Sequence, residues 1–307
     1  MIANFFNKTK PINTLFIIGL LFFIYIFSIG RHLEEEITLN FILKRILNFL
    51  LLLVTLFTVN FIIRKNNLTK DNSYTILLFV IFMGMFPFAV LEFKLLIVNL
   101  ILLFAYRRIY SLRTSKETYK KIFDSAFWIG VATILAPWSS LAILLIYVAI
   151  YLFDKVTWRN IIVPLVGFCT PIIIYVTYLY AINDINEFKE NLEYLYSFSF
   201  RIFNSATLLI PLALVTSLLI WSIFPTTFKI TTVNNEFKNS WYLLVFHFVI
   251  LLFVVLPWPV KNGGELLLLF FPIAVIFTNY LQIIEEKWFK EVFLYTLLAV
   301  VLTVFLL

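Results

Sequence analysis

Charged residues are scarce in this sequence. Asp, Glu, Lys and Arg together make up 13% of the 307 residues, whereas soluble domains carry about 25%. Hydrophobic residues reach 62% and the mean hydropathy is +0.98. This composition predicts that most of the chain lies in hydrocarbon and excludes a separate soluble catalytic domain. Any chemistry is therefore expected within the membrane or at its two faces.

Cysteine and histidine are almost absent as well. The one cysteine, Cys169, excludes a disulfide within the chain. Catalytic metal sites usually need about three protein ligands, and the two histidines, His32 and His247, cannot supply a histidine-only site. The sequence has no Gly-rich phosphate loop, no CxxC and no HExxH motif. We therefore expect no cofactor, with one alternative left open: a divalent metal bound by outer carboxylates.

Long apolar runs dominate what remains. A helix that crosses the hydrocarbon needs about 20 residues, and the runs predict an all-α, polytopic transmembrane bundle of about eleven spans, within a range of roughly nine to twelve. The predicted spans are Asn13–Ile29, Leu47–Ile63, Tyr74–Val90, Leu95–Tyr106, Ile122–Ala136, Leu141–Phe153, Ile161–Tyr180, Thr207–Phe224, Trp241–Leu256, Leu266–Ile283 and Val292–Leu307.

Several features refine these spans. The first run lacks the short apolar core and small-residue cleavage site of a signal peptide, so we interpret it as a retained span. A break is expected near Pro87. Thr38–Ile46 is predicted to form a separate helix at the membrane surface, and Ala181–Ala206 is expected to contain another amphipathic one.

The distribution of Lys and Arg predicts the topology. With the N-terminus inside, 17 of the 24 basic residues lie on the inner side and seven on the outer side, as the positive-inside rule requires. The basic inner loops are expected near 64–72, 107–121, 154–160 and 228–240, and the outer loops near 31–45, 181–206 and 257–265. We predict a single integral domain, 1–307, in a bacterial cytoplasmic membrane, with a cytoplasmic N-terminus and no nucleic-acid partner.

A cluster of charge follows the first span: Arg31, His32, Glu34, Glu35 and Glu36. A carboxylate beside the bilayer is suited to act as a general base when its surroundings tune its pKa. Arg31 and His32 are suited to hold a phosphate, which arginine binds through two parallel hydrogen bonds. The alternative is a solvated loop that ends the span, and for a charge run taken alone we favour that alternative.

Two further outer segments are candidates. Lys261 lies in the loop Pro257–Glu265, whose two prolines and two glycines predict a shaped turn; it would either meet a lipid phosphate or extend into water from an interfacial belt with Trp258. Glu92 and Lys94 are predicted to pair across a tight turn, or to support the first loop if the turn packs beside it.

Two ionisable residues lie elsewhere. Asp124 is expected to pair with Lys120 or Lys121 at the interface. His247 lies in the middle of a predicted span, where an ionisable side chain is either functional or hydrogen-bonded to a neighbouring helix.

The acidic loop after span one, the expected surface helix, the paired short hairpins and the late run Lys261 to Pro272 together resemble the GT-C class of membrane glycosyltransferases. This resemblance implies that one of Glu34, Glu35 or Glu36 is the base or a metal-linked residue, and that Lys261 holds the phosphate of a polyprenyl-linked sugar. The paired-acid motif and the soluble outer domain of that class are absent.

Over its full length the chain also resembles an uncharacterised family of bacterial polytopic inner-membrane proteins. The resemblance is carried by the opening Ile2–Lys8 with Pro11-Ile12-Asn13, and by Phe123–Gly130 continuing to Trp158-Arg159. It supports the architecture and implies no particular activity.

The leading hypothesis is a GT-C-like protein that binds a polyprenyl-phosphate lipid at its outer face and transfers its sugar. The second is a non-catalytic subunit or scaffold of an envelope or secretion assembly, which would bind other membrane proteins. The third is a transporter or lipid flippase, for which His247 and the segment Pro164–Pro171 are the mid-membrane candidates. Membrane lipids are partners in each case.

Overall fold

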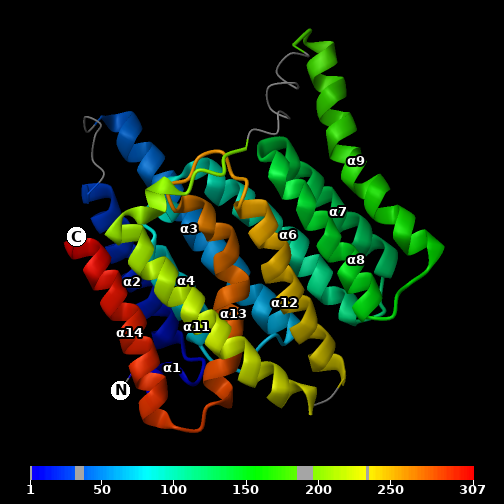
Figure 1. Ribbon diagram of the computed structural model, residues 1–307. Helices are drawn as coiled ribbons and strands as arrows, with labels where there is room; N and C mark the ends of the chain where they lie inside the picture. Colours follow the sequence, from blue (N-terminus) through cyan, green and yellow to red (C-terminus); the bar gives the residue numbers. More distant parts are fainter. Residues whose placement is uncertain (1, 32–37, 185–195, 233–234) are drawn as a thin grey trace. The chain divides into compact units, whose positions relative to one another are not determined.

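The computed structural model describes residues 2–31, 38–184, 196–232 and 235–307, and these residues contain helices and no strands (Figure 1). The α-helices are α1 (Ile2–Phe6), α2 (Pro11–Arg31), α3 (Leu39–Asn66), α4 (Tyr74–Met85), α5 (Phe88–Leu91), α6 (Phe93–Tyr110), α7 (Thr118–Leu135), α8 (Ile143–Leu152), α9 (Trp158–Ala181), α11 (Ala206–Thr231), α12 (Asn235–Val255), α13 (Leu267–Ile283) and α14 (Lys287–Leu306). Short 3-10 helices add η1 (Ser111–Arg113), η2 (Pro137–Ala142), η3 (Arg201–Asn204) and η4 (Gly264–Leu266).

The predicted fold class is confirmed. Within the described ranges, eight helices are long and apolar enough to cross a membrane: α2, α3, α6 with η1, α9, α11, α12, α13 with η4, and α14. The other three predicted spans correspond to α4, α7 and α8. Of these, α4 and α8 are only 12 and 10 residues long, and α7 carries Lys120, Lys121 and Asp124. The expected break at Pro87 is present, because α4 ends at Met85 and α5 begins at Phe88.

The start of α3 corrects one prediction. Thr38–Ile46 does not form a separate surface helix, and residues 39–45 are not part of a loop, because α3 runs unbroken over 28 residues. Thr38 caps it by accepting a hydrogen bond from the N–H of Phe41 at 3.2 Å. At 1.5 Å per residue the helix is about 42 Å long, against about 30 Å of hydrocarbon. Lys44 and Arg45 are therefore accommodated in the same helix.

The second predicted surface helix, within Ala181–Ala206, is only partly covered by the structure. Residues 185–195 lie outside the described ranges. Of the remainder, α9 ends at Ala181 and η3 spans Arg201–Asn204.

The chain divides into two compact units, each assembled from separate stretches. The first contains residues 1–96, 199–232 and 261–307, and the second contains 97–198 and 233–260. The sequence did not predict this division.

The core of the first unit is formed by α4 and α13. Every residue of α4 is buried, as is Leu267–Leu281 of α13. A hydrogen bond of 2.9 Å joins Thr75 of α4 to Thr278 of α13, and Phe82 contacts the rings of Phe270 and Phe277. Both helices carry predominantly apolar residues around their circumference, a pattern that is typical of a fully enclosed helix.

In the second unit, α7 and α9 pack with their backbones in close approach. A Cβ atom added to Gly130 of α7 would lie 2.5 Å from the carbonyl oxygen of Phe168, and one added to Gly167 of α9 would lie 2.7 Å from that of Phe123. Small residues allow such approach between membrane helices. The helix α9 continues through Pro164 and Pro171, both of which are buried. A neighbouring helix that packs this closely helps a membrane helix to tolerate proline, because it can satisfy the backbone groups that proline leaves without a hydrogen bond.

Candidate functional site

The candidate site begins at the loop that precedes α13, residues 261–265. Its carboxylate Glu265 is 1% exposed, and its Oε2 accepts hydrogen bonds from the backbone N–H groups of Gly263 at 2.9 Å and Asn262 at 3.3 Å. Gly263 has φ +89° and lies against Leu208, where a Cβ atom would come within 2.8 Å of that side chain. The positive φ favours glycine at this position. The loop is thus a fixed structure organised around a buried carboxylate.

Glu92 is bound to this loop. Its carboxylate accepts a hydrogen bond from Nδ2 of Asn262, while Oδ1 of Asn262 accepts one from the N–H of Gly264 at 2.9 Å. The predicted pairing of Glu92 with Lys94 is wrong: no ion pair joins these two described residues, and Lys94 is exposed. The alternative, that the turn packs beside the first outer loop, stays a prediction, because residues 32–37 of that loop lie outside the described ranges.

Lys261 is 9% exposed. Its ammonium nitrogen lies 4.9 Å from the centroid of the Phe200 ring, within the range of a cation–π contact. Of the two alternatives for Lys261, extension into water disagrees with this burial, and contact with a lipid phosphate stays a prediction. Burial lowers the pKa of Lys261, and the negative charge of Glu265 partly offsets that effect.

A cavity of about 220 Å³ adjoins the loop within the first unit. Two of its lining residues, Arg31 and Asn262, belong to two different predicted outer loops. The guanidinium of Arg31 donates a hydrogen bond to the carbonyl oxygen of Val304, which fixes the end of α2 against α14. The full lining consists of Arg31, Pro87, Phe88, Ile202, Ser205, Thr207, Leu208, Asn262 and Val304.

The structure therefore brings together three of the predicted segments. Arg31 and Asn262 both line the cavity. Asn262 also donates a hydrogen bond to Glu92, and Lys261 directly precedes Asn262 in the loop. His32, Glu34, Glu35 and Glu36 lie outside the described residues. Among the residues that the structure does describe, no group of three or more His, Cys, Asp or Glu side chains is arranged to hold a metal ion. The metal expected at the outer carboxylates stays a prediction.

Sequence reasoning missed three contributors: Asn262, Glu265 and Phe200. Glu265 was recognisable in principle, because it is an isolated carboxylate directly before a long apolar run and would be costly to bury without partners. Asn262 is an ordinary residue for a turn, and Phe200 is one of 36 phenylalanines. Neither carries a local signal.

The remaining candidates, both in the second unit, are held by structural contacts. Asp124 pairs with Arg108 at 2.8 Å rather than with Lys120 or Lys121, so that prediction is corrected. Lys121 instead donates to the carbonyl oxygens of Ser111 and Thr114. His247 is fully buried, and its Nδ1 lies 3.0 Å from the hydroxyl of Tyr110 on α6. The predicted hydrogen bond from His247 to a neighbouring helix is confirmed.

These apolar helices and their buried loop define a multi-pass, all-helical integral membrane protein. The chain belongs to the Family of unknown function (DUF6427), whose sequence profile matches residues 7–307. This match confirms the resemblance to an uncharacterised family. No curated protein and no solved structure matches the chain.

Proposed function

We propose that this integral membrane protein binds the phosphate of a polyprenyl-phosphate-type lipid in the cavity beside the 261–265 loop. The supporting observation is that Arg31 and Asn262 line one cavity, with Lys261 adjacent in the loop. A guanidinium and an amide are suited to bind phosphate oxygens. Positive charge beside the cavity attracts the head group of an anionic lipid.

The size of the cavity supports a head group rather than a whole glycolipid. Its volume of about 220 Å³ is below the about 300–1,000 Å³ typical of pockets that enclose a drug-sized ligand. The apolar chain of the lipid would remain outside, along exposed hydrophobic side chains near Arg31. Phe27 is 52% exposed, and its ring contacts Phe305 of α14.

The proposed reaction is sugar transfer from this lipid, as the resemblance to the GT-C class implies. One of Glu34, Glu35 or Glu36 takes the proton of an acceptor hydroxyl. The acceptor oxygen forms a bond to the anomeric carbon of the sugar, and the bond from that carbon to the lipid phosphate breaks. The lipid phosphate leaves with the bonding electron pair, and Arg31 and Lys261 stabilise its negative charge.

Replacing Arg31 by glutamine is expected to weaken binding of a polyprenyl phosphate by about tenfold, since a charge-assisted hydrogen bond contributes roughly 1.5–3 kcal/mol. The measurement is a titration of the full-length protein in detergent micelles. Lys44→Gln is the matched control, because Lys44 is an exposed cation that does not line the cavity. Equal losses in both variants, or no binding by the unaltered protein, would refute the binding proposal.

Replacing Glu34, Glu35 and Glu36 together by glutamine is expected to abolish transfer while leaving lipid binding in place, because the amides retain the shape of the carboxylates and cannot accept the proton. The measurement is the surface glycan profile of cells that carry only the variant. An unchanged profile would eliminate the catalytic step and leave the binding proposal intact.

A further inference from the structure

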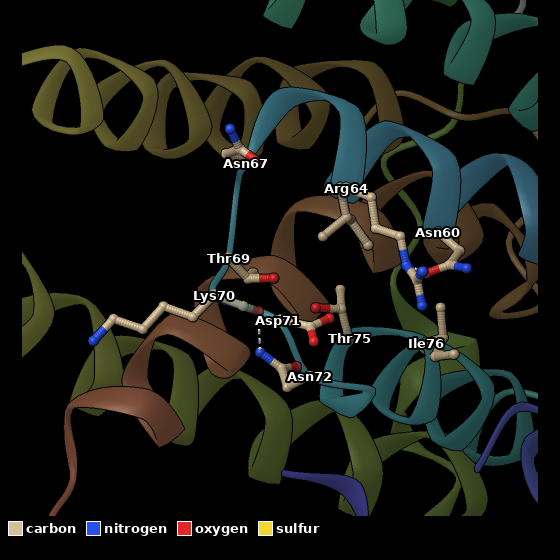
Figure 2. A pocket seen from close by; sticks show the side chains of 10 residues that line it. Asn60, Arg64, Asn67, Thr69, Lys70, Asp71, Asn72, Thr75 and Ile76 are labelled. Carbon is tan, nitrogen blue, oxygen red and sulfur yellow. Dashed lines mark hydrogen bonds between the residues drawn. The ribbon is translucent and has the colours of Figure 1, made fainter. Parts of the chain in front are cut away.

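A second cavity lies at the other end of α4, within the first unit and apart from the site described above. Its volume is about 270 Å³ (Figure 2). Although most of this chain is apolar, eight of its ten lining residues are polar. They are Asn60, Arg64, Asn67, Thr69, Lys70, Asp71, Asn72 and Thr75, with Ile63 and Ile76 completing the wall.

Arg64 provides positive charge to this cavity. Figure 2 shows its side chain directed into the cavity beside Asn60, whose Oδ1 accepts a hydrogen bond from Nε at 3.1 Å. No carboxylate pairs with Arg64 in the part of the chain that the structure describes. The two terminal guanidinium nitrogens, which bind phosphate oxygens in parallel, are therefore available to a ligand.

The start of α4 contributes to the same cavity. Thr75 and Ile76, in its first turn, line the wall, and the first N–H groups of a helix have no acceptor within the helix. Ser73 precedes the helix without capping it, and Oδ1 of Asn72 accepts from the N–H of Tyr74, which leaves the N–H groups of Thr75 and Ile76 without an acceptor in the helix. The positive end of α4 and the guanidinium of Arg64 thus both favour an anion here.

Asp71 adds the opposite charge. Its carboxylate lines the cavity and accepts a hydrogen bond from the hydroxyl of Thr9, and no cation pairs with it among the described residues. Figure 2 shows the side chain of Lys70 directed away from Asp71. A ligand that carried only negative charge would be repelled by Asp71, whereas one that also carried an ammonium group would be complementary to both sides.

Hydrogen bonds within the chain hold the shape of the cavity. The side-chain amide of Gln282 accepts from the N–H of Lys70 at 3.2 Å and donates to its carbonyl oxygen at 3.3 Å. That carbonyl oxygen also accepts from Asn72 at 2.6 Å, and Oδ1 of Asn72 accepts from the N–H of Tyr74 at 2.9 Å. The loop between α3 and α4 is fixed at several points, so little ordering is required on binding.

We propose that this cavity binds a phosphate group joined through a short linker to a primary ammonium group, as in phosphoethanolamine. The ligand is either the free molecule or the head group of a phospholipid. Arg64 and the N–H groups of Thr75 and Ile76 bind the phosphate, and Asp71 accepts from the ammonium. The neutral amides and hydroxyls of the wall complete the hydrogen bonds. This inference does not depend on the proposed function.

The test measures binding to the full-length protein in detergent with two soluble probes, phosphoethanolamine and inorganic phosphate. Phosphoethanolamine is expected to bind more tightly, by about tenfold, because an additional charged hydrogen bond is made. Arg64→Gln should weaken both probes by about tenfold. Asp71→Asn should weaken phosphoethanolamine and leave inorganic phosphate unchanged or tighter.

Lys65→Gln is the matched control. It removes the same charge from the neighbouring position, where Lys65 lies over the ring of Phe61 and does not line the cavity. Arg64→Lys, which keeps the charge and loses the paired geometry, is expected to bind with intermediate strength.

A second experiment, with lipids, identifies the source of the ligand. The protein is reconstituted in nanodiscs of phosphatidylethanolamine or of phosphatidylcholine, whose quaternary ammonium cannot donate a hydrogen bond. Selective retention of phosphatidylethanolamine, lost in Arg64→Gln, supports the lipid head group; binding of soluble phosphoethanolamine alone supports the free molecule. The proposal is overturned if neither form binds, if Lys65→Gln loses as much as Arg64→Gln, or if Asp71→Asn affects neither probe.

Discussion

Replacing Gly130 by valine is expected to lower the stability of the second unit by about 3 kcal/mol, toward the upper end of the penalties for overpacking. A Cβ atom at this position would lie 2.5 Å from the carbonyl oxygen of Phe168 and 2.6 Å from Cγ of Pro171. Neither neighbour is the end of a flexible side chain, so α9 as a whole would have to move away from α7. The measurement is thermal unfolding of the purified protein in detergent, followed by circular dichroism.

Gly19→Val in α2 is the matched control, because it makes the same substitution within a helix where no atom lies within 4 Å of the added Cβ. Its effect is expected to stay within about 0.5 kcal/mol, as for surface substitutions. Equal changes in unfolding temperature for the two variants would show that close packing of α7 and α9 does not govern stability.

Replacing Glu265 by alanine is expected to destabilise the first unit by about 3 kcal/mol and to weaken binding of polyprenyl phosphate. The N–H groups of Asn262 and Gly263 would lose their acceptor, and hydrogen bonds to a charged group contribute roughly 1.5–3 kcal/mol each. The loop that places Asn262 in the wall of the cavity would then lose the hydrogen bonds that fix its conformation. Unfolding temperature and lipid affinity are measured on the same preparation.

Glu265→Gln provides the comparison for this result. The amide keeps the shape of the side chain and one acceptor oxygen, so both effects are expected to be smaller than those of Glu265→Ala. If the alanine variant unfolds at the same temperature as the unaltered protein, Glu265 does not organise the loop.

Much of the fold was predictable because the span signal is local. Each of the eleven apolar runs corresponds to a helix, and Pro87 marks a break because proline removes a backbone donor. The error at Thr38–Ile46 has a physical cause. The charges of Lys44 and Arg45 favour a separate surface helix before the span, yet a helix of 28 residues is longer than the hydrocarbon is thick and can carry both charges without interruption.

The site was predictable only where scarce charge marked it. Arg31, Glu92 and Lys261 stood out for that reason, and the structure brings their segments together. The contacts that join them could not be inferred, because Glu92 and Asn262 are separated by 170 positions and asparagine is common in turns. The Glu34–Glu36 prediction concerns residues outside the described ranges and stays a prediction.

The interleaving of the two units sets an order of assembly during synthesis. The last segment of the second unit ends at Val260, before α13 and α14 of the first unit have been made. The second unit is therefore able to close first. The helix α4, which is only 12 residues long and entirely enclosed in the finished fold, has to wait for α13 to supply its packing partner. The ribosome will have added nearly two hundred residues in the meantime, roughly 10–40 s at about 5–20 residues per second.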